Sequence, residues 1–182
     1  MAEKKQTVIE TFSAKETFEY AKGLAEKAKG GEVYCLDGDL GVGKTVFAQG
    51  FGAGLGITEP MASPTFTILK EYHQGRLGLF HFDVYRIGSE DEMEEIGFYD
   101  LVGRPDGVSL IEWFTLIEGI IPEDAVRVTI EKNPEKGFDY RRIIMTEGHP
   151  PELLQIYVLR QKCRKRLRPL PAAHQHNWNS KI

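Results

Sequence analysis

The sequence is poor in cysteine and has no long apolar run. Its two cysteines, Cys35 and Cys163, lie far apart and outside any CxxC pattern, so we expect neither a disulfide framework nor a zinc site. No stretch reaches the roughly 18 apolar residues that a membrane-spanning helix needs. The start, MAEKKQTVIE, lacks the apolar segment of a secretory signal. These absences predict a cytoplasmic protein that does not act at a membrane.

Charge is distributed unevenly along the chain. Residues 149–182 carry seven Lys or Arg against one Glu, a charge of +6; because the whole chain carries −4, the remainder carries −10. An acidic body is not expected to bind nucleic acid through its own surface, whereas the basic segment leaves such a contact open. We therefore expect a single domain over residues 1–148 and a basic extension over 149–182, partly helical or disordered.

Apolar patterning alternates between strand-like and helix-like segments. Ser13 and Glu16 have capping-box spacing before a helical pattern that should stop at Gly30. A second helix should follow Gly43, and the acidic segment 89–102 should form one short helix capped by Ser89. Strands are expected over 7–12, 32–37, 107–113, 125–131 and 140–146, with a hairpin of 66–72 and 77–85. This order predicts an α/β fold with a mixed sheet.

One glycine-rich segment carries a complete phosphate-binding motif. Residues 38–45, GDLGVGKT, fit G-x-x-x-x-G-K-[ST] without a mismatch, between an expected strand and an expected helix. The glycines let successive amides point into one concavity, Lys44 can reach the outer phosphates, and the Thr45 hydroxyl can bind magnesium. The alternative, a turn that merely joins strand to helix, is disfavoured by the motif and its context together.

A carboxylate is expected beside this loop. Glu112 ends the apolar run 107–113, and in doubly wound sheets the C-terminal ends of the strands border the phosphate loop. We interpret Glu112 as a Walker-B-like acid that holds magnesium, directly or through water, or positions the attacking water. An ordinary solvated glutamate at a strand end is the alternative.

Two further segments carry polar groups at strand-like spacing. In HFDVYR, His81, Asp83 and Tyr85 share one face, and such a stripe taken alone is more often a solvent face than a site. SPTFT, residues 63–67, offers three hydroxyls after a rigid turn. They could sense a γ-phosphate or simply lead into a strand.

The sequence closely resembles the TsaE family, also called YjeE, in five motifs and their order: GDLGVGKT, SPTFT, HFDVYRI, EEIGFYD and IEW. The resemblance covers about residues 6–148. It implies a P-loop NTPase-like three-layer fold with a mixed parallel/antiparallel sheet flanked by helices. Thr115 departs from the acid that relatives often have after the Glu-Trp pair, and the segment after 149 is unlike the short ending usual in the family.

The same resemblance implies roles for particular residues. Lys44, Asp83 and Glu112 form the implied catalytic set, in which Asp83 is a catalytic or water-positioning carboxylate. Thr45 and Glu112 form the implied magnesium site, and contacts with adenine are placed around Ser13. The implied nucleotide contacts are Asp39, Leu40, Gly41, Val42, Gly43, Lys44, Thr45, Val46, Thr65 and Trp113.

The function implied by the resemblance is the ATPase of bacterial tRNA threonylcarbamoyladenosine synthesis. Its cofactors would be ATP and Mg²⁺, and its partners TsaD and TsaB, which transfer a threonylcarbamoyl group to adenosine 37 of tRNA. Contact with tRNA would come through the complex, with direct contact by the basic extension left open. Hydrolysis should be weak without partners, because the motifs contain no obvious arginine finger, although Arg86 is one candidate.

Three other functions share the phosphate loop. A small-molecule kinase would need an acceptor pocket and a lid, and no arginine-rich lid segment is evident in the body. A GTPase is disfavoured because no N-K-x-D motif is present. A nucleotide-gated binding module whose hydrolysis is incidental remains the non-enzymatic alternative.

Overall fold

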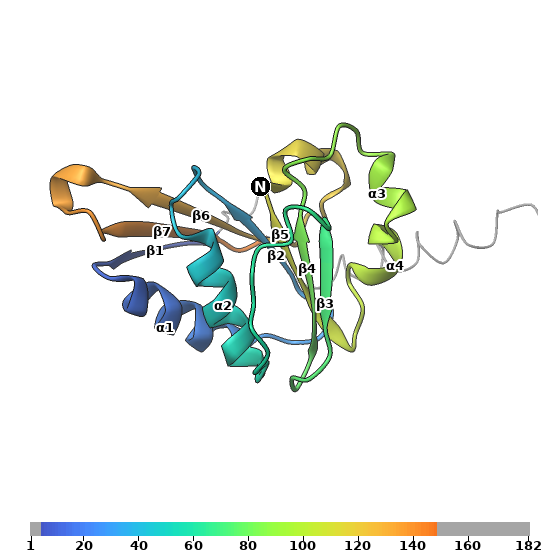
Figure 1. The fold of residues 1–182 in the computed structure, drawn as a ribbon, viewed down its shortest axis with the longest axis horizontal. Helices are drawn as coiled ribbons and strands as arrows, with labels where there is room; N and C mark the ends of the chain where they lie inside the picture. Colours follow the sequence, from blue (N-terminus) through green and yellow to red (C-terminus); the bar gives the residue numbers. More distant parts are fainter. Residues whose placement is uncertain (1–4, 149–182) are drawn as a thin grey trace, which may run out of the picture.

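The described chain is built on one seven-stranded mixed sheet with the strand order β1-β7-β6-β2-β5-β4-β3 (Figure 1). The computed structural model describes residues 5–148, so the extension expected over 149–182 lies outside the described residues. The strands are β1 Gln6–Thr11, β2 Val33–Asp37, β3 Leu69–Tyr72, β4 Gly78–Asp83, β5 Gly107–Glu112, β6 Val126–Lys132 and β7 Arg141–Thr146.

The centre of the sheet is parallel and its two sides are antiparallel. β2 pairs in parallel with β5 and β6, and β4 pairs in parallel with β5. β1–β7, β6–β7 and β3–β4 pair antiparallel. Every residue of β5 is buried, as expected for a central strand covered on both faces. The predicted mixed sheet is therefore confirmed, and so is the hairpin, although β3 starts at Leu69.

Helices cover both faces of the sheet, which makes three layers. α1 (Ala14–Ala25) and α2 (Lys44–Leu55) bury their apolar side chains in one core, and α3 (Glu92–Glu95), α4 (Phe98–Leu101) and the 3-10 segment η1 (Phe114–Ile120) bury theirs in a second core. A short 3-10 turn, η2 (Pro134–Lys136), lies between β6 and β7. None of the helices in residues 5–148 is long and apolar enough to cross a membrane.

The capping box predicted for α1 is present. The Ser13 hydroxyl accepts a hydrogen bond from the Glu16 amide, and the Glu16 carboxylate accepts one from the Phe12 amide. The helix ends at Ala25, earlier than the predicted stop at Gly30. Arg76, from the distant β3–β4 hairpin, donates hydrogen bonds to the carbonyls of Ala25 and Ala28. The end of α1 is thus satisfied by tertiary contacts, which its local sequence does not reveal.

The prediction of one helix over 89–102 is wrong. The segment forms two four-residue helices, α3 and α4, separated at Gly97, which has a φ of 78°. Asp91, rather than Ser89, precedes the first helical residue. The left-handed conformation at Gly97 ends one helix and redirects the chain, so that both Met93 and Phe98 are buried.

Glycines in α2 let it approach α1 closely. A Cβ atom on Gly50 would lie 2.2 Å from the Phe18 carbonyl oxygen, and one on Gly54 would lie 2.2 Å from the Lys22 carbonyl oxygen. These glycines reduce the helix propensity of α2. The helix nevertheless continues to Leu55, because the side of α2 that carries the glycines is buried against α1. This contact sets the position of α2, and hence of the loop before it.

Gly50→Ala should lower the free energy of unfolding by about 1–3 kcal/mol, because the new methyl group presses against helix backbone. Gly23 in α1 is the matched control: a Cβ atom there meets nothing within 4 Å. Gly23→Ala should instead raise stability by about 0.5–1 kcal/mol through helix propensity. Urea denaturation of both variants measures the difference, and equal effects would contradict the close helix contact.

Candidate nucleotide site

Three strand ends meet at one edge of the sheet. β2 ends at Asp37, and the loop 38–43 connects it to α2. Glu112, at the end of β5, pairs in register with Leu36 of β2 and with Asp83 at the end of β4. The parallel register therefore places two carboxylates side by side next to the glycine-rich loop, at the edge where α/β sheets bind ligands.

The loop adopts backbone conformations that suit glycine. Gly38 has a φ of 139° and Gly43 a φ of 107°. A Cβ atom on Gly38 would lie 2.4 Å from the Ile130 carbonyl oxygen, so no side chain fits there. Gly43 precedes α2 without a side-chain cap, which leaves the first amides of this 12-residue helix available to an anion.

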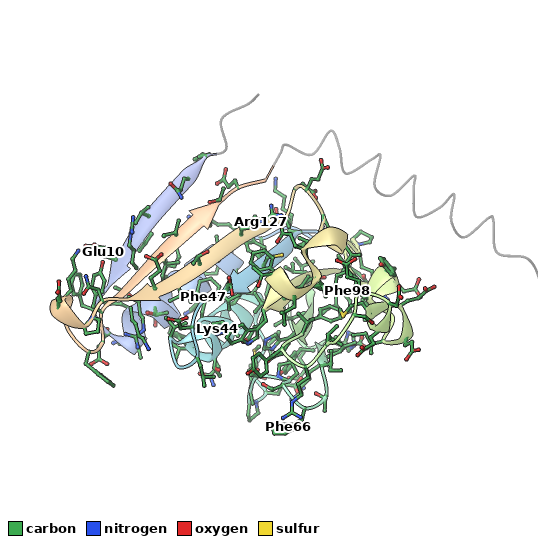
Figure 2. The ribbon with its side chains drawn as sticks, turned by 90° about the horizontal axis from the view of Figure 1, so that it is seen from above. Glu10, Lys44, Phe47, Phe66, Phe98 and Arg127 are labelled. Atoms are coloured by element: carbon green, nitrogen blue, oxygen red, sulfur yellow. The ribbon has the colours of Figure 1, made fainter. Side chains whose placement is uncertain are left out.

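Lys44 is the first residue of α2 and lies toward the centre of the molecule in Figure 2. Its Nζ donates to the carbonyls of Gly38 and Asp39, at 2.6 and 3.0 Å, and lies 3.8 Å from the centre of the Trp113 ring. Burial lowers the pKa of Lys44, and the charges of Glu112 and other nearby carboxylates oppose that change. The amine is thus a buried cation held by polar atoms that phosphate oxygens can replace.

Trp113 has an unusual backbone that directs its ring into the site. Its φ of 62° lies in the left-handed region, which is rare for a residue other than glycine, and its amide donates to the Leu36 carbonyl at 3.1 Å. The Tyr85 ring lies 5.1 Å from the Trp113 ring, measured between centroids. β4 ends at Asp83, so Tyr85 does not continue the predicted polar stripe but lies half-exposed against Trp113.

Asp83 connects the SPTFT segment to the end of β4. Its Oδ2 accepts hydrogen bonds from the hydroxyls of Ser63 at 2.5 Å and Thr65 at 2.7 Å, and its Oδ1 accepts one from the Tyr85 amide at 3.1 Å. Asp83 is buried, and so is His81 on the same strand. Interpreting this stripe as a solvent face is therefore wrong: β4 is covered on both sides, because α2 packs on the face that carries these polar groups.

Glu112 is also buried, which rules out the solvated strand-end alternative. Its Oε1 lies 2.8 Å from Nε2 of His81, which is itself fully buried. Within residues 5–148 no group of three or more His, Cys, Asp or Glu residues could hold a metal ion. A metal here would need oxygen ligands from outside the protein as well.

The other predicted contacts are distributed along the loop and beyond it. Thr65 is held by Asp83, and Val42 has its side chain in the core. The Arg86 guanidinium lies 4.4 Å from the centre of the Phe66 ring, and Phe66 projects from the periphery (Figure 2). Exposed or half-exposed positions around the turn and the first turn of α2 are Asp39, Leu40, Gly41, Gly43, Thr45 and Val46.

Sequence reasoning misses Arg141 entirely. This residue begins β7, and its Nε donates to the Val42 carbonyl of the phosphate loop at 2.6 Å. A Cβ atom on Gly43 would lie 3.9 Å from the same nitrogen. The two positions are 99 residues apart, and no local motif marks Arg141. Only the pairing of β6 with β7, which brings the start of β7 to the loop, could have identified it.

Comparison with known proteins identifies the family to which the chain is similar. The family model described as "Threonylcarbamoyl adenosine biosynthesis protein TsaE" matches residues 11–143. The chain is 46% identical over 151 residues to the tRNA threonylcarbamoyladenosine biosynthesis protein TsaE of Bacillus subtilis, covering 82% of this chain and 92% of that protein. It is 38% identical over 125 residues to the protein of the same name from Nostoc, covering 69% and 68%.

The fold is also shared with a solved structure. The crystal structure of YdiB from Bacillus subtilis superposes with a TM-score of 0.67 at 36% sequence identity, covering 91% of this chain and 99% of that one. This similarity confirms the predicted P-loop NTPase-like three-layer fold. With the family match over most of the described residues, it shows that the chain belongs to the TsaE family.

Proposed function

We propose that this chain is a magnesium-dependent ATPase that serves threonylcarbamoyladenosine synthesis on tRNA. The observation that carries the proposal is the convergence of Lys44, Asp83 and Glu112 at the ends of parallel strands around a glycine-rich loop. The relatives named for this biosynthesis supply the biological process. The reaction is phosphoryl transfer from ATP to water.

Lys44 is proposed to bind the outer phosphates. In the structure its ammonium contacts carbonyl oxygens of its own loop, and these neutral acceptors are weaker partners than phosphate oxygens. Because the amine is already desolvated and close to the amides that begin α2, binding would exchange partners without burying a new charge. The Trp113 ring beneath it limits where the ammonium can move.

Thr45 and Glu112 are proposed to hold magnesium. A hydroxyl and a carboxylate are oxygen ligands, which Mg²⁺ prefers, and two protein ligands suffice because this ion normally completes its shell with phosphate oxygens and water. The absence of a larger ligand cluster in the described part fits a metal that arrives with the nucleotide. The bound ion would neutralise charge that develops on the transferring phosphoryl group.

Asp83 is proposed to position the attacking water. Its two oxygens accept from Ser63, Thr65 and the Tyr85 amide, so the carboxylate orientation is determined before nucleotide binds. The same bonds hold the SPTFT loop against the strand end. Release of Thr65 toward the γ-phosphate would couple this loop to the nucleotide.

The proposed partners are TsaD and TsaB, with tRNA reached through their complex. In this conformation Arg141 donates to the Val42 carbonyl and the exposed Arg86 lies over the Phe66 ring. We propose that the isolated chain hydrolyses ATP weakly and that partner binding completes the site. The basic extension over 149–182 is a second proposed route to tRNA.

Phosphate release measured with and without cognate TsaD and TsaB tests this function. We expect Mg²⁺-dependent release from ATP that rises when both partners are present. Transfer of the phosphoryl group to an added small molecule would instead indicate a kinase. Full binding of ATP without stimulated release would indicate a nucleotide-gated binding module.

Lys44→Ala should weaken ATP binding by about 10- to 100-fold, the value expected for losing one or two charge-assisted hydrogen bonds. Lys70→Ala is the matched control, because Lys70 is an exposed lysine on β3. Titration with a fluorescent ATP analogue measures both affinities. Equal affinity of the wild-type chain and Lys44→Ala would contradict the phosphate-loop assignment.

Asp83→Asn should keep nucleotide affinity and reduce partner-stimulated hydrolysis by about 10²- to 10⁴-fold. The amide oxygen can still accept from Ser63 and Thr65, but the side chain carries no charge and its NH2 group cannot accept from the Tyr85 amide. Asp106→Asn is the control, since Asp106 is exposed at the surface. Single-turnover phosphate release with both partners measures the step. Normal turnover by Asp83→Asn would remove this residue from the mechanism.

A further inference from the structure

His81 is a fully buried polar residue that the proposed mechanism does not yet use. It lies within β4, and its neighbours Phe80 and Phe82 point into the core on the other face of the sheet. In the parallel register it pairs with Leu110 of β5, two residues before Glu112. His81 and Glu112 therefore both lie on strands inside the sheet, where the backbone can adjust little.

The ring nitrogen of His81 that donates follows from its partner. A carboxylate oxygen only accepts hydrogen bonds, so the nitrogen 2.8 Å from Glu112 Oε1 is the one that carries the hydrogen. The other ring nitrogen, Nδ1, is buried and has no hydrogen-bond partner within the described residues. Histidine at this position thus leaves one buried polar atom unsatisfied, a cost that an apolar side chain of similar volume would avoid. The bond to Glu112 is what distinguishes histidine from leucine here.

The bond affects which part of Glu112 faces the site. Oε1 lies against His81 Nε2, so Oε2 is the oxygen left to meet a ligand. The Lys44 ammonium is close enough for Glu112 to be its strongest electrostatic attraction. A carboxylate free to rotate could pair with Lys44 and compete with phosphate, whereas one held by a strand-borne histidine keeps Oε2 available and its direction constant.

We infer that His81 is a positioning residue that fixes Glu112 through Oε1 and so presents Oε2 to the magnesium ion or its bound water. This inference rests on the proposed role of Glu112 in the magnesium site. His81 itself touches neither metal nor nucleotide in this arrangement. Its effect is to orient the Glu112 carboxylate in advance, as hydrogen-bond partners of metal-binding carboxylates generally do.

Two substitutions separate this role from simple core packing. His81→Leu fills the space without a donor, and His81→Gln supplies an amide N–H at about the reach of Nε2. We expect His81→Leu to raise the half-saturating Mg²⁺ concentration for ATP hydrolysis by about 10- to 100-fold, and His81→Gln to recover most of that loss. ATP affinity measured without Mg²⁺ should change little in either variant.

His73→Leu is the matched control, because His73 is an exposed histidine next to Glu71 on β3. It should leave the Mg²⁺ titration unchanged. Thermal unfolding of all three variants, followed by circular dichroism, identifies any that fail to fold. If His81→Leu does not fold, His81→Gln should still show a half-saturating Mg²⁺ concentration close to wild type, and the ring NMR measurement described next decides.

A second measurement needs no nucleotide. In ¹⁵N-labelled wild-type protein, NMR of the histidine rings should show a hydrogen on Nε2 of His81, and His81→Gln assigns the signal. A hydrogen on Nδ1 alone would overturn the inference. So would wild-type Mg²⁺ dependence in folded His81→Leu, or equal losses in the leucine and glutamine variants. A wild-type chain that neither binds ATP nor responds to Mg²⁺ would overturn the proposed function instead.

Discussion

The parallel register of β2, β5 and β4 is the constraint on which the site depends. It aligns Leu36, Glu112 and Asp83 at one edge of the sheet, so that the loop after β2 and the carboxylates after the other strands meet. A slip of one residue would turn each carboxylate to the opposite face, into the core below α3 and α4. Continuous burial on both faces of β5 opposes such a slip, because the pleat assigns a separate apolar core to each face.

Within this frame, the charged groups are buried but not isolated. Lys44 lies between carbonyl oxygens and the Trp113 ring, Asp83 accepts two hydroxyl hydrogen bonds, and Glu112 accepts from His81. Burying a charge without such partners would cost several kcal/mol, roughly the whole stability of a small domain. The same partners also fix the orientation of these groups, so one set of contacts both stabilises the buried charges and orders the candidate site.

Much of the fold and part of the site could be predicted from local pattern. The phosphate loop, the α1 capping box and the strand segments depend on residues close together in the chain, where spacing determines hydrogen bonding and burial. The predicted helix boundaries were wrong where tertiary contacts, rather than the local sequence, determine the structure. α1 ends at Ala25, and Arg76 donates to the carbonyls of Ala25 and Ala28 at and just after this end. The acidic segment 89–102 divides at Gly97, and both Met93 and Phe98 are buried.

The sequence by itself determined the local features of the candidate site: a loop that must expose amides, a lysine and a hydroxyl beside it, and carboxylates at the ends of apolar strands. Only the tertiary structure decided their partners. Ser63 meets Asp83 across 20 positions, His81 meets Glu112 across 31, and Arg141 meets the loop at Val42 across 99. The physical reason is that a strand's own sequence specifies its two faces through alternation, whereas its neighbour and its register depend on how the whole sheet buries its apolar surface.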